Sequence, residues 1–338
     1  MRAVGFNMPQ PITEDTSLID IDLPMPAAAG RDLLVEIRAV SVNPVDAKVR
    51  ASAAVEPGDH RVLGYDAAGV VKAVGPEVTL FQPGDAVFYA GALDRPGTNA
   101  EFHLVDERIV GRKPESLSFE QAAALPLTAI TAYEAMLHRM KVQEPVPGAA
   151  NAILIIGGAG GVGSIAIQLA RELTDLTVIA TASRPETQAW IRELGAHHVI
   201  DHSQPLAPQV EALGLGSPAF VFSTTETEQH LDDILALIAP QGRFCLIDDP
   251  KNPMDLRPFK RKALSIHWEL MFTRSLYQTE DMIEQHKLLD HVAELVDAGR
   301  IRTTLAETYS TINAANLKRA HAMIESGRAK GKIVLSGF

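Results

Sequence analysis

The feature that most constrains the fold is a glycine-rich turn between an apolar strand and an amphipathic helix. An apolar run over 152–156 leads into Gly158-Ala159-Gly160-Gly161-Val162-Gly163, and apolar residues then recur at helical spacing from Val162 to Leu173. Glycine clusters are common in turns, so the motif alone could mark a purely structural turn. Its position between a strand and a helix is instead typical of a dinucleotide-binding loop.

Each glycine of this loop has a physical role in cofactor binding. The first permits a tight turn, the second lets the backbone approach a pyrophosphate, and the third lets helix and strand pack closely. The helix N-terminus adds N–H groups and the positive end of the helix dipole. The predicted cofactor-binding residues of the loop are Gly158, Gly160, Gly161, Val162 and Gly163.

The residues that follow the second predicted strand indicate which dinucleotide binds. A site for NAD usually has Asp or Glu about 20 residues beyond the glycines, where the carboxylate accepts from the ribose 2′-OH. The segment Thr181-Ala182-Ser183-Arg184 has no carboxylate. Ser183 offers a hydroxyl and Arg184 a planar cation, which suits a 2′-phosphate. Ser183 could instead only cap the helix that Pro185 opens, with Arg184 solvated, but the missing acid favours NADPH.

The periodicity of the apolar residues changes along the chain. Residues 1 to about 115 read as short strands between turns, which is typical of a small β-barrel or sandwich. From residue 151, strands alternate with helices, which predicts an α/β region with a doubly wound parallel sheet.

The C-terminal segment has a third pattern. We expect a long helix that Thr279 caps and Gly299 ends, a second helix over about 313–326, and a last strand over 332–335. The pattern alone leaves open whether this segment extends the parallel sheet or returns to the β-rich region.

Length and charge limit the possible functions. The 338 residues are enough for two hydrophobic cores, and 46% hydrophobic with 22% charged residues is normal for a globular protein. The net charge of −11 disfavours nucleic acid and anionic membranes as partners. No apolar stretch is long enough to span a bilayer, and no N-terminal signal segment is visible. We therefore expect a cytoplasmic protein that acts on a small molecule.

The chain has a single cysteine, Cys245. This excludes an intramolecular disulfide, an Fe–S cluster and any zinc site that needs two thiolates. The 11 histidines do not supply a site either, because there is no H-E-x-x-H motif and the adjacent His197 and His198 point to opposite faces of a strand. Cys245 falls in a predicted strand, where we expect an inert core thiol.

Several motifs in register resemble the medium-chain dehydrogenase/reductase superfamily. Within it, the chain is most similar to the zinc-free quinone oxidoreductase branch, whose members are often called zinc-type alcohol dehydrogenase-like proteins. The matching segments, in chain order, are Asn43-Pro44-Val45-Asp46, Gly64-Tyr65-Asp66-Ala67-Ala68-Gly69 with Gly75 and Val78, residues 81–87, the glycine-rich loop, and Gly331-Lys332-Ile333-Val334. The resemblance covers essentially the whole chain.

This resemblance implies a specific domain organisation. A GroES-like β domain would cover 1–124, an inserted Rossmann domain 125–265, and a segment over 266–338 would return to the first domain. It also implies an active site in the cleft between the domains, and a homodimer.

The resemblance also indicates which residues stand at the positions of the family's zinc ligands. In zinc-dependent members the metal is bound by Cys, His and Cys, with a glutamate beside the His; these align with Asn43, Tyr65 and Leu127, and with Asp66. An amide, a phenol and an isobutyl group cannot hold Zn²⁺. We therefore expect no metal.

Without a metal, alcohol oxidation lacks its usual Lewis acid. Reduction of a quinone or an α,β-unsaturated carbonyl is easier, because the conjugated system delocalises the charge that hydride delivers. The expected function is therefore NADPH-dependent, metal-free reduction of such acceptors. Two alternatives stay open. The first is an enoyl-thioester reductase, against which residues 43–66 show no basic patch for the phosphates of coenzyme A. The second is an NADPH-binding sensor or scaffold without turnover.

Four residues are candidates for catalysis. Asn43 could donate its amide N–H to the substrate carbonyl, or be only a turn residue before Pro44. Asp46 could orient Asn43, water or the cofactor ribose. Tyr65 could be a hydrogen-bond donor or proton source, or an aromatic packing residue. Thr131 resembles the threonine beside the nicotinamide ring.

Two further segments match family patterns. Lys332 resembles the basic residue near the cofactor pyrophosphate, although it could be solvated at a strand start. Phe272-Thr273-Arg274-Ser275 resembles a subgroup signature, to which the sequence assigns no role.

Overall fold

The chain leaves its first structural unit once and returns to it once. In the computed structural model, which describes all 338 residues, unit 1 comprises Met1–Ile130 with Phe272–Phe338, and unit 2 comprises Thr131–Met271. These crossings lie a few residues beyond the predicted boundaries at 124/125 and 265/266. Helix α3 (Pro126–Tyr133) is continuous across the first crossing, and strand β14 (Ser265–Trp268) stays in unit 2 because it pairs with β13 (Arg243–Leu246).

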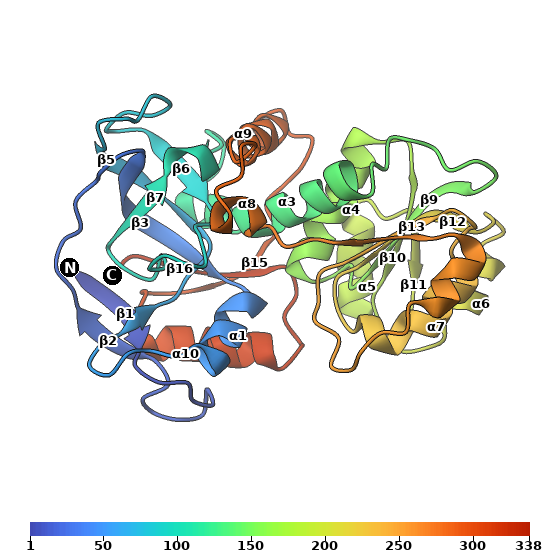
Figure 1. Cartoon of the computed structure of the whole chain (residues 1–338), viewed down its shortest axis with the longest axis horizontal. Coiled ribbons are helices and arrows are strands. Elements are labelled where there is room, and N and C mark those ends of the chain that lie inside the picture. Colours follow the sequence, from blue (N-terminus) through green and yellow to red (C-terminus); the bar gives the residue numbers. More distant parts are fainter. The chain divides into compact units, whose positions relative to one another are not determined.

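Unit 1 is built on two β-sheets (Figure 1). The larger one has the order β15-β16-β3-β5-β6-β8, with β7 also paired to β3, and the smaller one has the order β2-β1-β4. The strands are β1 (Arg2–Phe6), β2 (Ile19–Asp22), β3 (Asp32–Val42), β4 (Arg61–Val62), β5 (Ala67–Val74), β6 (Ala86–Tyr89), β7 (Phe102–Asp106), β8 (Val110–Arg112), β15 (Leu305–Tyr309) and β16 (Lys332–Ser336). The predicted β-rich region is thus confirmed.

The C-terminal strand determines which residues meet in unit 1. Strand β16 runs antiparallel to β3, with Ile333 opposite Val42. This register places Lys332, the first residue of β16, beside Asn43, which directly follows β3. The C-terminal segment therefore returns to the β-rich region, and two residues from opposite ends of the chain become neighbours.

Five helices complete unit 1 together with part of α3. They are α1 (Pro44–Ser52), α2 (Phe119–Ala123), α8 (Thr273–Leu276), α9 (Glu284–Asp297) and α10 (Ala314–Glu325). A short 3₁₀ helix covers Glu107–Ile109. Asn313 caps α10 by accepting the Asn316 N–H at 2.8 Å, close to the predicted start of that helix.

The start of α9 differs from the prediction. We expected a helix directly after Thr279, but α9 begins at Glu284. The Asp281 carboxylate bonds two side chains at once. Its carboxylate accepts from the Thr279 hydroxyl at 2.7 Å and from the Arg274 guanidinium at 2.8 Å, which holds the intervening residues in a turn. Gly299, with φ of +70°, follows the C-terminal end as predicted.

Helix α10 packs against α1, the helix that begins after Asn43 (Figure 1). The buried contact includes His321, which is fully buried and whose two ring nitrogens have no hydrogen-bond partner. Burial, together with the nearby Arg50 charge, lowers the pKa of His321 to about 3.

His321 is expected to make the protein sensitive to mild acid. Below about pH 6.5 the unfolded chain takes up a proton on this histidine while the folded chain does not, so the contribution of His321 to stability falls as the pH drops. We expect His321→Leu to raise the unfolding free energy at pH 5, relative to that at pH 7, by about 2 kcal/mol compared with the wild type. Urea unfolding at both pH values measures this, with the exposed His60→Leu as control. An equal pH 5 to pH 7 difference in the His321 variant and the wild type would refute the assignment.

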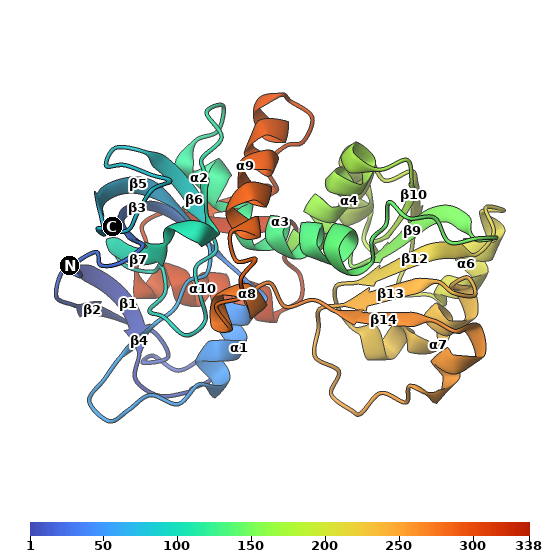
Figure 2. The same cartoon turned by 45° about the horizontal axis from the view of Figure 1, so that its top comes forward.

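Unit 2 is a six-stranded parallel sheet of order β11-β10-β9-β12-β13-β14 (Figure 2). Its other strands are β9 (Ala150–Ile156), β10 (Thr177–Thr181), β11 (His198–Ile200) and β12 (Pro218–Ser223). Its helices are α4 (Gly161–Leu173), α5 (Pro185–Glu193), α6 (Leu206–Ala212) and α7 (Thr227–Leu237), with a π-helical turn over Glu134–Arg139 and a 3₁₀ helix over Arg257–Lys262. The predicted doubly wound sheet is confirmed.

The alternating side chains of the central strands form the core of unit 2. On β9, Ala152, Leu154 and Ile156 face α6 and α7, in one cluster with Leu206 and Ile234. The residues between them face the side covered by α4, which contacts β9 and β10. This cluster of apolar side chains packs beneath the glycine-rich turn, which follows the carboxyl end of β9.

Two absences concern the whole chain. No helix of the structure combines the length and apolar character that crossing a membrane requires. No group of three or more His, Cys, Asp or Glu side chains could hold a metal ion. Cys245 is fully buried in β13, and burial raises the pKa of its thiol, as an inert core cysteine requires.

Candidate active site

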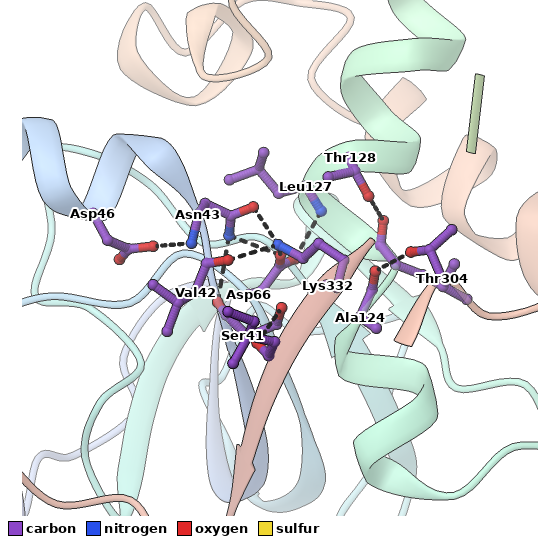
Figure 3. Close-up of polar contacts among 12 residues, drawn as sticks. Ser41, Val42, Asn43, Asp46, Asp66, Ala124, Leu127, Thr128, Thr304 and Lys332 are labelled. Carbon is purple, nitrogen blue, oxygen red and sulfur yellow. Dashed lines mark hydrogen bonds and ion pairs between the residues drawn. The ribbon is translucent and has the colours of Figure 1, made fainter. Parts of the chain in front are cut away.

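A buried polar cluster in unit 1 joins the two ends of the chain (Figure 3). The Lys332 ammonium lies 3.0 Å from Asp66 Oδ2 and 3.1 Å from the Val42 carbonyl oxygen, and it also donates to Asn43 Oδ1. Asp66 Oδ2 accepts from Asn43 Nδ2 at 2.8 Å, and Asp66 Oδ1 accepts the Leu127 backbone N–H at 2.8 Å. We call Lys332, Asp66 and Asn43 the ammonium cluster.

Asn43 has no amide hydrogen left for a substrate. One Nδ2 hydrogen goes to Asp66 and the other to the Ser41 carbonyl oxygen at 3.3 Å, while Oδ1 accepts from Lys332. The predicted donation to a substrate carbonyl does not fit this geometry. Asn43 holds the cluster together, and it also occupies the position that precedes α1.

Asp46 fixes the backbone around the cluster. Its Oδ2 accepts the Asn43 N–H at 2.7 Å, and its Oδ1 accepts the Gly64 N–H at 2.9 Å. Gly64 has φ of +109°, and a Cβ there would approach Thr98 Oγ1 to 2.5 Å, so only glycine allows this turn. The structure therefore places Asp46 as the orienting residue of Asn43, one of the roles that we considered from sequence.

One cation, Lys332, lies near two carboxylates, Asp66 and Asp46. Asp46 and Asp66 are both buried. Desolvation raises the pKa of Asp46 to about 7, against the opposing effect of its hydrogen bonds and of Lys332. Desolvation also raises the pKa of Asp66, although the Lys332 charge opposes it. The region can therefore hold one exchangeable proton near neutral pH.

The Tyr65 hydroxyl is buried, and the Arg61 side chain can donate a hydrogen bond to it. Its ring packs edge-on against Phe272, with ring centroids 5.4 Å apart. Desolvation and the Asp46 charge raise the pKa of the phenol, and the nearby Arg61 only partly offsets this. The hydroxyl is thus kept protonated, its hydrogen has no acceptor within the chain, and the ring is a packing residue.

The contact with Phe272 gives a role to part of a segment that the sequence left unexplained. Phe272 supports the Tyr65 ring, and Arg274 pairs with Asp281. The Ser275 hydroxyl donates to the Phe272 carbonyl at 3.0 Å, which holds the start of α8. The sequence motif singled out this segment, but it did not predict the contact between Phe272 and Tyr65.

Lys332 does not match either of its predicted positions. It is 2% exposed, so it is not solvated at a strand start. An ammonium has three hydrogens, and Lys332 has three acceptors within unit 1, so no donor remains for a pyrophosphate. The register of β16 against β3 is the physical reason.

The glycine-rich loop of unit 2 has the shape that a dinucleotide requires. The tight turn falls at Gly157, with φ of +80°, one residue before the predicted Gly158. At Gly163 a Cβ would lie 2.3 Å from the Gly157 carbonyl oxygen and 2.6 Å from Gly158 Cα, so the helix can only approach the strand without a side chain.

The start of α4 is open for a ligand. Gly160 occupies the position before the helix and provides no side-chain cap, which leaves the first N–H groups of α4, from Gly161, Val162 and Gly163, available. At Gly160 a Cβ would meet only the Gly157 carbonyl oxygen, at 3.5 Å. Uncapped N–H groups at a helix N-terminus fit a pyrophosphate.

The end of β10 lies next to the glycine-rich loop. Arg184, rather than Ser183, takes the position before α5, and its guanidinium lies 3.2 Å from Glu186 Oε1. The Thr181 hydroxyl accepts the Gly157 N–H at 3.0 Å and lies 2.9 Å from His202 Nδ1. Sequence reasoning missed His202, which follows β11 and is brought here because β11 pairs with β10.

Thr131 is the first residue of unit 2. It lies on α3 and is 5% exposed. Its predicted place beside the nicotinamide stays a prediction.

The positions that align with zinc ligands do not form a metal site. Asn43 and the Leu127 backbone N–H both bond Asp66, which pairs with the Lys332 ammonium. The donors present are an amide oxygen that already accepts from Lys332, one carboxylate, and a leucine side chain. Zn²⁺ prefers thiolate and imidazole ligands and would be repelled by the buried ammonium. The residues therefore do not fit the metal.

Comparison with known proteins agrees with the architecture. Residues 29–115 match the family model "Alcohol dehydrogenase GroES-like domain", and residues 194–335 match "Zinc-binding dehydrogenase". The chain is 38% identical to a zinc-type alcohol dehydrogenase-like protein of Staphylococcus aureus over 99% of this chain and 100% of that protein. The chain belongs to the medium-chain dehydrogenase/reductase superfamily, among its zinc-type alcohol dehydrogenase-like proteins. The resemblance inferred from the motifs is thus confirmed.

Solved structures give the same result for this superfamily member. A protein from Rhizobium etli, described provisionally as a zinc-dependent alcohol dehydrogenase, is 69% identical and superposes with a TM-score of 0.98 over 100% of this chain and 98% of its own. A quinone oxidoreductase from Pseudomonas syringae is 26% identical, with a TM-score of 0.83 over 99% of both chains. The superfamily consists of NAD(P)H-dependent oxidoreductases, and the loop geometry of unit 2 fits such a cofactor.

Proposed function

We propose that this chain reduces quinones or α,β-unsaturated carbonyl compounds with NADPH, by direct hydride transfer and without a metal. The observation that carries the proposal is the donor set at the positions aligned with zinc ligands: Asn43, Tyr65 and Leu127 offer no thiolate or imidazole, and Asn43 is bound within the ammonium cluster. Alcohol oxidation needs a group that stabilises an alkoxide, and this donor set offers none. Reduction of a conjugated acceptor needs only hydrogen-bond donors at its oxygen.

The cofactor assignment rests on unit 2. NADPH, when bound, supplies the hydride. The uncapped N-terminus of α4 would hold its pyrophosphate, and Ser183, Arg184 and His202 would surround its 2′-phosphate. Because the Thr181 hydroxyl accepts from Gly157 and lies against His202 Nδ1, its own hydrogen can go to Nδ1, which leaves His202 Nε2–H as a donor.

Tyr65 is the residue of unit 1 best suited to act on the acceptor. Its hydroxyl is protonated, and its hydrogen has no acceptor within the chain. Donation to the acceptor oxygen would stabilise the enolate or hydroquinone anion as hydride arrives. Asp46, with its pKa near 7, would be a proton reservoir close enough to influence Tyr65.

Removing the Tyr65 hydroxyl while keeping the ring distinguishes hydrogen-bond donation to the acceptor from packing by the ring. We expect Tyr65→Phe to lower kcat by about 10- to 100-fold, because one positioned donor is lost, while the unfolding free energy changes by less than about 0.5 kcal/mol. The matched control is Tyr89→Phe, because the Tyr89 hydroxyl bonds His103 Nδ1 at 3.0 Å. That variant should lose about 1 kcal/mol of stability and keep its kcat. An unchanged kcat in Tyr65→Phe would leave Tyr65 as a packing residue.

A panel of acceptors tests the proposed function itself. Oxidation of NADPH and NADH is followed with quinones, enones, an enoyl thioester and, in the reverse direction, simple alcohols with NADP⁺. We expect turnover with NADPH and quinones or enones, and none with alcohols. Turnover confined to alcohols or to the thioester would overturn the proposal. NADPH binding without turnover on any acceptor would instead support a sensor.

A further inference from the structure

Two hydrogen bonds in succession join the glycine-rich loop of unit 2 to the imidazole of His202. The Thr181 hydroxyl accepts the Gly157 N–H at 3.0 Å and lies 2.9 Å from His202 Nδ1. Thr181 is fully buried, whereas His202 is half-buried. No hydrogen bond within the chain involves His202 Nε2. One ring nitrogen is thus held by the protein, and the other can bind a ligand.

The ionisable groups near His202 come from several elements. Asp201 directly precedes it, Arg184 stands before α5, and the His230 ring on α7 lies 6.3 Å away between ring centroids. His230 is buried, and three carboxylates lie near it, those of Glu226, Asp233 and Asp248. The positive charge on this side of the loop therefore depends on Arg184 and on whether the imidazoles carry a proton.

The free protein keeps both imidazoles neutral at pH 7. Desolvation lowers the pKa of His202 below its usual value near 6.5, and the Arg184 charge adds to this effect while the Asp201 charge opposes it. Desolvation and the neighbouring His202 lower the pKa of His230. A phosphate monoester such as the 2′-phosphate of NADPH is mostly a dianion at pH 7. One guanidinium alone does not balance it.

We propose that His202 takes up a proton when NADPH binds, so that the preference for NADPH over NADH becomes stronger as the pH falls from about 8 to about 6.5. This proposal rests on the cofactor site of the proposed function. It goes beyond that function by making the choice of cofactor depend on pH.

The proton has a defined place in the hydrogen bonds on the page. In the free protein the Thr181 hydrogen goes to His202 Nδ1, and Nε2 carries the ring hydrogen. With phosphate present, Nε2–H donates to a phosphate oxygen and a proton from the buffer adds to Nδ1. The new Nδ1–H then donates to Thr181 Oγ1, whose second lone pair keeps the bond from Gly157. NADH carries a hydroxyl instead of the dianion, so it does not favour the charged imidazole.

Titration calorimetry of the full chain with NADPH measures the proton directly. At pH 6.5, in two buffers of different ionisation enthalpy, we expect the wild type to take up on the order of 0.5 proton more than His202→Gln. Protons from the phosphate itself cancel in this comparison, because both proteins bind it. Gln keeps an N–H donor, so at pH 8 this variant should bind NADPH within about threefold of the wild type. Equal proton uptake by the two proteins would overturn the proposal.

Two further variants identify the imidazole that takes up the proton. His230→Gln removes the neighbouring ring, and His198→Gln is the control, because His198 is a half-buried histidine of the same strand, β11. Both should keep the proton uptake of the wild type. Loss of the uptake in His230→Gln, with full uptake in His202→Gln, would place the proton on His230 and overturn the proposal.

A nucleotide fragment gives a test that does not depend on the affinity of a variant. The NMR signal of the His202 ring, identified by its loss in His202→Gln, is titrated with pH in the wild type, alone and with 2′-AMP or 5′-AMP. We expect 2′-AMP to raise the titration midpoint by about one pH unit or more, and 5′-AMP to leave it nearly unchanged. A midpoint that 2′-AMP does not move would contradict the proposal.

The affinities for both cofactors at pH 6.5 and pH 8 separate this proposal from the proposed function. Over this range the NADPH affinity of the wild type should fall about 3- to 10-fold more than that of His202→Gln, and the NADH affinity should change equally in both. A wild type that prefers NADPH to the same degree at both pH values would overturn this proposal alone. A wild type that prefers NADH at both pH values would contradict the cofactor of the proposed function.

Discussion

Gly163→Ala is expected to weaken NADPH binding at least 100-fold and to lower the unfolding free energy by about 1–3 kcal/mol. The added Cβ would lie 2.3 Å from the Gly157 carbonyl oxygen and 2.6 Å from Gly158 Cα. Both are backbone atoms, so the start of α4 must move away from β9. This movement would displace the N–H groups that are expected to hold the pyrophosphate. Titration calorimetry with NADPH and urea unfolding measure the two effects.

Gly160→Ala is the matched variant in the same loop. A Cβ at Gly160 meets only the Gly157 carbonyl oxygen, at 3.5 Å, which is ordinary contact. This variant should fold with nearly wild-type stability but bind NADPH about tenfold more weakly, because the methyl group lies where the pyrophosphate approaches the backbone. A Gly163→Ala protein with wild-type affinity would contradict the account of the loop.

Arg184→Ala is expected to lower the affinity for NADPH by about 10- to 100-fold and to leave the affinity for NADH unchanged. The guanidinium follows β10, and no carboxylate occupies residues 181–184 that could bind a ribose 2′-OH instead. The effect is therefore specific to the 2′-phosphate. Binding of both cofactors to the wild type and the variant measures it.

Arg192→Ala is the control for this experiment, because Arg192 is an exposed arginine on the same helix, α5. It should change neither affinity. If Arg184→Ala binds NADPH as tightly as the wild type, or if the wild type prefers NADH, the assignment of NADPH is wrong.

The parts of the fold with local signals could be predicted from the sequence. The strand–loop–helix around Gly158 identified the parallel sheet, and the position of Asn313 marked the start of α10. The tight turn was misplaced by one residue because Gly157 and Gly158 are adjacent and only the backbone angle tells them apart. The start of α9 was misplaced because Arg274 pairs with Asp281, a contact that helix-start patterns do not include.

The candidate site was harder to predict, because its central contacts are not local. Lys332 and Asn43 are separated by 289 positions, and only the register of β16 against β3 makes them neighbours. A resemblance can align both residues with family motifs without showing that they bond each other. The same holds for His202, which reaches Thr181 through the pairing of β11 with β10. The absence of zinc ligands was visible in the sequence, but the buried pair of Lys332 and Asp66 beside Asn43 was not.

The most direct test of the account follows the hydride itself. The purified chain, with zinc measured below about 0.1 per chain and a chelator present, is given NADPH with deuterium at both C4 positions, [4,4-²H₂]NADPH, and an enone, and the product is analysed by mass spectrometry. We predict one deuterium on the β-carbon of the saturated ketone, formed at the same rate with and without added Zn²⁺. A product without deuterium, or transfer that requires Zn²⁺, would contradict metal-free hydride transfer.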